Sequence, residues 1–149
     1  MNDLWEESMN QVTQTNHNNN IQRQINDRNQ RIMNARSTLT TITGNIERLQ
    51  SAQRNLSRLL NDYHVYQRLV QTEHRDIPMS LFHGSQRRTV DQRCDLLVAS
   101  LKQEFSGHER NLQSLITRIR QLESERASIT LNISSLTSEV SNLQRQLIR

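Results

Sequence analysis

The apolar residues of this chain recur at alternating spacings of four and three. The first series runs from Ile21 to Val70, and twelve of its fifteen positions are apolar; the polar exceptions are Arg28, Gln53 and Gln67. Residues at these spacings lie on one face of an α-helix and form the seam of a coiled coil. The series therefore predicts a first helical arm over residues 21–75.

A second series with the same spacings runs from Cys94 to Leu147. Fourteen of its sixteen positions are apolar, and the exceptions are His108 and Arg126. This series predicts a second helical arm over residues 86–149. Two amphipathic helices with a short connection prefer to fold back on each other, so the pattern predicts an all-α fold, a long antiparallel two-helix coiled-coil hairpin.

The connection between the arms is predicted at residues 76–85. The only proline of the chain, Pro78, lies there together with Gly84, and proline cannot continue the hydrogen-bond ladder of a helix. At the other end, residues 1–20 contain a tract rich in asparagine, a poor helix former. We therefore expect a weakly ordered, polar lead-in over 1–20 and a single hairpin domain over 21–149.

Composition excludes most globular classes. Only 33% of the residues are hydrophobic and 3% aromatic, and the mean hydropathy is -0.82. Ordinary soluble domains are roughly 45–50% apolar, so a β-sandwich or a doubly wound enzyme lacks the material for its core. Long helices need only a seam of apolar residues, and the near absence of proline and glycine argues against disorder.

The net charge of +4 raises the question of nucleic-acid binding. Cationic residues are spread along the chain, and no run exceeds Arg87 and Arg88. With few aromatic side chains for stacking, nucleic acid ranks last among the partners considered. No stretch reaches the roughly 18 apolar residues of a membrane span, and the start is unlike a signal peptide. The lone Cys94 is compatible with a reducing compartment, so we expect a cytoplasmic protein and leave open its export beside a cargo without a cleaved signal.

No arrangement of residues in the sequence predicts chemistry. The five histidines are scattered and give no pair of metal ligands on one helical face. Cys94 falls on the seam, where a buried thiol is far more common than a nucleophile. We therefore predict a protein that is not an enzyme and that has no cofactor or metal.

Two seam exceptions suggest a register. If the turn centres near residue 80, Gln53 of the first arm faces His108 of the second. They could form a buried polar layer that fixes the register, as polar seam residues do in coiled coils. The alternative is that both side chains bend towards solvent.

Several large apolar residues lie beside the seam rather than on it, among them Leu97 and Ile116. A two-helix hairpin covers such residues poorly, so we expect another helical surface to cover them, either a second copy or a different chain. Leu81 and Phe82 in the predicted turn either tuck back onto the bundle or project as an anchor for a partner. The predicted partner-binding residues are Leu81, Phe82, Gly84, Leu97 and Ile116.

The turn and the second arm resemble a known family. Phe82-His83-Gly84 stands where the WXG100-related proteins place Trp-x-Gly, and the stretch from Ile119 to Leu147 is similar to their terminal coiled coil. The resemblance, over roughly residues 65–148, is to the small helical partners of LXG-domain toxins of the type VIIb (Esx) secretion system. Phe82 replaces the tryptophan of that motif, and the Tyr-x-x-x-Asp/Glu export signal of WXG100 proteins is absent.

The resemblance implies a non-enzymatic chaperone or targeting factor. Such a protein binds the helical N-terminal domain of a toxin side by side and assists its targeting to the secretion apparatus, with further small helical proteins as additional partners. The alternative hypothesis, from the coiled-coil pattern, is a structural rod or stalk component of an export machine that associates with itself.

Overall fold

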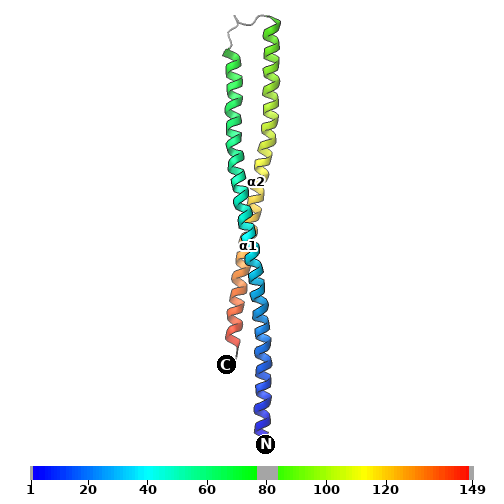
Figure 1. The fold of residues 1–149 in the computed structure, drawn as a ribbon, viewed down its shortest axis with the longest axis vertical. Coiled ribbons are helices and arrows are strands. Elements are labelled where there is room, and N and C mark those ends of the chain that lie inside the picture. The colour runs from blue at the N-terminus through cyan, green and yellow to red at the C-terminus, as the bar shows by residue number, and fades with distance from the viewer. Residues whose placement is uncertain (1, 77–83, 148–149) are drawn as a thin grey trace. The chain divides into compact units, whose positions relative to one another are not determined.

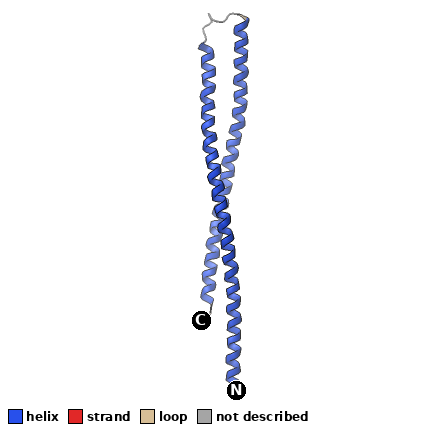
Figure 2. Ribbon diagram, viewed as in Figure 1, coloured by secondary structure: helices blue, strands red, loops and turns tan. Residues whose placement is uncertain are grey.

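The computed structural model describes residues 2–76 and 84–147, and side chains over 5–73 and 84–147. Two α-helices make up the described chain: α1, Asn2–Asp76, and α2, Ser85–Gln146 (Figures 1 and 2). The predicted all-α, two-helix hairpin is confirmed. Leu81, Phe82 and most of the predicted turn lie outside the described residues.

The predicted seam is the face that each helix buries. Every position of the two predicted series, from Ile21 to Val70 and from Cys94 to Leu147, is buried or half-buried. Apolar side chains at the 3-4 spacing pack against a second helix because this removes their surface from water while the opposite face stays hydrated. The polar exceptions are half-buried, which is possible at the seam of a two-helix pair since its edges are open.

The predicted lead-in needs correction, because α1 already begins at Asn2 and residues 2–20 continue the same helix. Poor helix formers cost only a few tenths of a kcal/mol each, whereas an existing helix gains one backbone hydrogen bond per added residue. The Thr13 and Thr15 hydroxyls donate to the carbonyl oxygens of Met9 and Gln11, at 2.9 and 2.8 Å, which satisfies them within the helix.

The arm boundaries also shift slightly. The first arm ends at Asp76 rather than residue 75, and the second begins at Ser85 rather than residue 86; its helix ends at Gln146, and residues 148 and 149 lie outside the described residues. Gly84 immediately precedes α2. Its φ is 58°, a left-handed conformation that glycine adopts without steric cost. Its carbonyl oxygen accepts a hydrogen bond from the Arg88 backbone N–H at 3.3 Å, as expected of the residue that caps a helix N-terminus.

The chain divides into two compact units, and the first comprises residues 1–45 and 122–149. Its core is a cluster of buried aliphatic side chains from both helices. Ile133 and Leu143 of α2 pack against this cluster, and so does Leu147, which follows the end of α2. The buried members are Ile21, Ile25 and Ile32 of α1 with Leu136 and Val140 of α2.

Polar contacts in this unit show that the helices are antiparallel. His17 Nε2 of α1 lies 3.4 Å from the Gln146 carbonyl oxygen of α2, and eleven residues further along α1 the Arg28 Nε donates to Glu139 Oε2 at 3.2 Å. Arg28 occupies a seam position and is half-buried, and its guanidinium reaches both Glu139 and Asp27. This explains how one polar exception is tolerated in the seam.

The second unit comprises residues 46–121 and is richer in aromatic contacts. The ring centroids of His64 in α1 and Phe105 in α2 are 4.2 Å apart. Those of Tyr63 and His108 are 5.9 Å apart. Leu60 is buried in the same region, with 6% of its surface exposed.

Candidate functional site

The second unit has two different sides, and the seam spacing explains why. In coiled-coil notation Leu60 and Phe105 occupy a positions, and Tyr63 and Leu101 occupy d positions. Residues just before an a position (g) project to one side of an antiparallel pair, and residues just after a d position (e) project to the other. Each side has its own groove, formed by residues of α1 and α2 within this unit.

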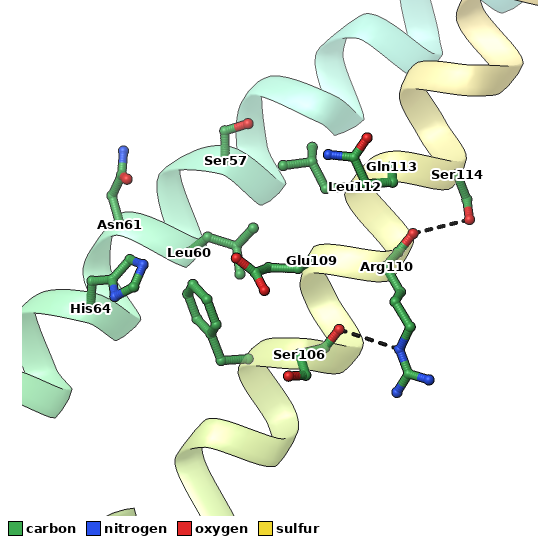
Figure 3. A pocket seen from close by; sticks show the side chains of 11 residues that line it. Ser57, Leu60, Asn61, His64, Ser106, Glu109, Arg110, Leu112, Gln113 and Ser114 are labelled. Atoms are coloured by element: carbon green, nitrogen blue, oxygen red, sulfur yellow. Dashed lines mark hydrogen bonds between the residues drawn. The ribbon is translucent and has the colours of Figure 1, made fainter.

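The groove on the e side, which we call the polar groove, is drawn in Figure 3. His64 of α1 and Glu109 of α2 occupy e positions, and hydroxyl and amide side chains fill most of the rest. The Arg110 Nε donates to the Ser106 carbonyl oxygen at 3.4 Å. The polar side chains that line the groove include Ser57, Asn61, His64, Ser106, Glu109 and Gln113.

The arrangement within the polar groove gives no sign of acid–base chemistry. The His64 ring packs on Phe105, and over the described side chains it makes no hydrogen bond to a hydroxyl or carboxylate. No group of three or more His, Cys, Asp and Glu side chains within 5–73 and 84–147 is placed to hold a metal ion. Cys94 is half-buried on the seam of α2.

The groove on the g side, which we call the acidic groove, is lined by Leu59, Asp62, Tyr63, Tyr66 and Leu101. Leu59 and Tyr66 are large apolar or aromatic side chains that are 54% and 53% exposed, so the hairpin leaves them uncovered. The Tyr63 hydroxyl donates to Glu104 Oε2 of α2 at 3.4 Å, and this places a second carboxylate at the rim. The groove therefore combines exposed apolar surface with two carboxylates.

The predicted partner-binding residues do not form one surface. Leu97 occupies a g position and is 42% exposed, on the side of the acidic groove. Ile116 occupies an e position and is half-buried on the other side. Gly84 is exposed at the start of α2, and Leu81 and Phe82 lie outside the described residues.

The expected Gln53–His108 layer is not the pairing found in the structure. His108 lies against Tyr63, which is ten residues, roughly 15 Å, further along α1 than Gln53. That contact is diagonal: the pairs Tyr63–Glu104 and His64–Phe105 place position 60 level with 108, so the expected and observed registers differ by one heptad. Such a shift keeps every seam residue opposite a seam residue, so the apolar pattern alone cannot distinguish the two registers.

Sequence reasoning missed two exposed features. Tyr66 was not recognised as a surface residue, although its place one residue before seam position 67 could have shown it. At the start of α1, Trp5, Met9 and Val12 are 72%, 71% and 59% exposed, and their spacing places them on one face of the helix. This stripe had no predicted role because the segment was expected to be weakly ordered.

Comparison with known proteins gives no further identification. No protein-family model matches the chain, and neither curated proteins nor solved structures show a significant similarity to it. The class defined by fold and surface is thus an all-helical, two-helix hairpin with exposed apolar side chains beside its seam. Neither described helix has a stretch both long and apolar enough to cross a membrane.

Proposed function

We propose that this protein is a non-enzymatic helical adaptor that binds the long helices of another protein. The observation that carries the proposal is the set of apolar and aromatic side chains left exposed beside the seam, including Leu59, Tyr66 and Leu97, which are 54%, 53% and 42% exposed. Exposed apolar surface on a helix is typical of a protein-binding face, where an apolar ridge of a partner covers it.

The partner we propose is the helical N-terminal domain of a secreted toxin. In this role the adaptor lies alongside the toxin domain in the cytoplasm and assists its targeting to a type VII secretion apparatus. The support for this finer statement is the resemblance of the turn and second arm to WXG100-related partners of LXG toxins.

Co-expression with the products of neighbouring genes that begin with long helical domains tests the proposal. We expect a complex that co-elutes in size-exclusion chromatography. Leu97→Arg should weaken it, since Leu97 flanks the seam, whereas Leu96→Arg should not, because Leu96 is 71% exposed on the face opposite the seam. Failure with every such neighbour would overturn the adaptor role. Strong self-association in sedimentation, with no cargo bound, would instead favour a structural rod or stalk.

A further inference from the structure

We propose that the acidic groove is the docking site of a basic amphipathic helix, one with an apolar ridge flanked by lysine or arginine. This inference rests on the proposed adaptor function and specifies the chemistry of the partner. It starts from the apolar floor: Leu59 and Tyr66 are seven residues apart on α1 and about half exposed. A partner helix with apolar residues at i and i+7 repeats this spacing of roughly 10 Å.

The charge of the groove selects the partner. Asp62 lines it, and Glu104 is held at its rim by the Tyr63 hydroxyl. Over the described side chains neither carboxylate makes an ion pair with a cation of this chain. Both therefore remain available to a cation from outside.

The distribution of cations next to the acidic groove points the same way. The g positions and the adjacent c positions lie on the side of the acidic groove. None of them between 55 and 69 or between 97 and 114 is Lys or Arg, whereas Arg48, Arg93 and Arg118 occupy such positions further along the unit. On the opposite side, the e and b positions of the same stretches carry Arg68 and Lys102 beside one carboxylate, Glu109. In a chain with 19 cationic and 15 acidic residues, this local lack of cations leaves the acidic groove with a negative charge that its partner must complement.

Charge also argues against a second copy as the occupant. Two acidic grooves packed face to face would bring Asp62 and Glu104 of one copy towards the same carboxylates of the other. Like charges in contact disfavour such an interface, because each loses water without gaining a counter-ion. A partner with cations beside its apolar ridge avoids this cost.

A pair of synthetic peptides tests the assignment on the full-length protein. Both are amphipathic helices with leucine along one face; one carries lysine beside the ridge and the other glutamate. We expect the lysine peptide to bind more tightly, with an affinity that falls as salt is raised. Asp62→Asn with Glu104→Gln should weaken the lysine peptide by roughly three- to thirty-fold, the range expected for two exposed charge pairs.

The matched control removes the same two charges elsewhere in the unit. Asp95→Asn with Glu109→Gln makes identical substitutions at e positions and leaves the acidic groove intact. It should change lysine-peptide binding by less than about twofold, since exposed charges on the far side are screened. Equal loss in both double variants would show attraction to net charge alone and would overturn the groove assignment.

Tyr66→Ala tests the apolar contact independently of charge. Tyrosine is a frequent hot spot, so we expect at least about a tenfold loss of peptide binding. Val65→Ala is the control, because Val65 is 48% exposed on the same helix but lies outside the groove. Circular dichroism of both variants verifies that the helices remain folded.

The outcomes separate this inference from the proposed function. If a toxin complex forms and is unaffected by Tyr66→Ala, the groove assignment is overturned while the adaptor role stands. If the lysine peptide binds as expected but no toxin complex forms with any neighbour, the adaptor role fails and the groove remains a site for basic helices. A dimer of the protein that Tyr66→Ala converts to monomer would overturn the choice of partner in favour of a second copy.

Discussion

Replacement of Leu136 with alanine should strongly destabilise the first unit. Leu136 is 2% exposed within the cluster of aliphatic side chains that joins α1 and α2. The substitution removes three carbon atoms, and at about 0.8 kcal/mol per buried carbon the lost transfer free energy is about 2.4 kcal/mol. The cavity left behind adds to this, and a cost of roughly 2.5–3.5 kcal/mol follows, at the lower end of the usual range because an open two-helix seam can partly close.

The matched control is Leu131→Ala, five residues earlier on the same helix. Leu131 is 73% exposed, so only about a quarter of the same transfer free energy, about 0.6 kcal/mol, is at stake. Urea denaturation followed by far-ultraviolet circular dichroism measures both free energies of unfolding. Equal costs for the two variants, or a cost below about 1 kcal/mol for Leu136→Ala, would refute the assignment of the core.

Two further pairs of variants test the register and the helix start. In a Cys94→Ser background, a short thiol cross-linker should bridge cysteines that replace His64 and Phe105 within one chain. It should not bridge cysteines that replace Gln53 and His108, because those positions are one heptad out of register. Mass spectrometry of peptides detects the bridge, and preferential bridging of the second pair would contradict the observed register. Gly84→Ala should lower the free energy of unfolding by about 1 kcal/mol, since a φ of 58° strains an alanine. Gly107→Ala in mid-helix should raise it by about 0.5–1 kcal/mol, because alanine favours the helix and nothing lies within 4 Å of the added Cβ. Thermal or urea denaturation measures both changes, and the same sign for both would be inconsistent with this account.

Much of the fold could be predicted from the spacing of apolar residues. The buried face of each helix, from Ile21 to Val70 and from Cys94 to Leu147, could be predicted from the sequence alone. Apolar residues that follow the 3.6-residue period of a helix lie on one face, which is then buried. The extension of α1 back to Asn2 could not be predicted in this way. Local propensities disfavour the asparagine tract, while propagation from an established helix outweighs them.

The candidate site was predicted only in its general character. The sequence predicted that apolar residues beside the seam, such as Leu97, contact a partner helix. It did not reveal which of these residues share a surface. That depends on which side of the helix pair each residue occupies, as the contrast between Leu97 and Ile116 shows. The acidic groove arises only when Tyr66 and Asp62 of α1 meet Leu101 of α2, and the Tyr63 hydroxyl brings Glu104 to the rim.

The sequence by itself determined that this protein is a pair of helices joined near its only proline, with a seam along each. The tertiary structure decided the register and the two unlike sides of the second unit. The physical reason is the heptad repeat. A displacement of seven residues leaves the apolar seam intact, so hydrophobic burial cannot choose between registers, and that choice sets which polar and aromatic residues meet across the helices, as His64 meets Phe105 and Tyr63 meets His108.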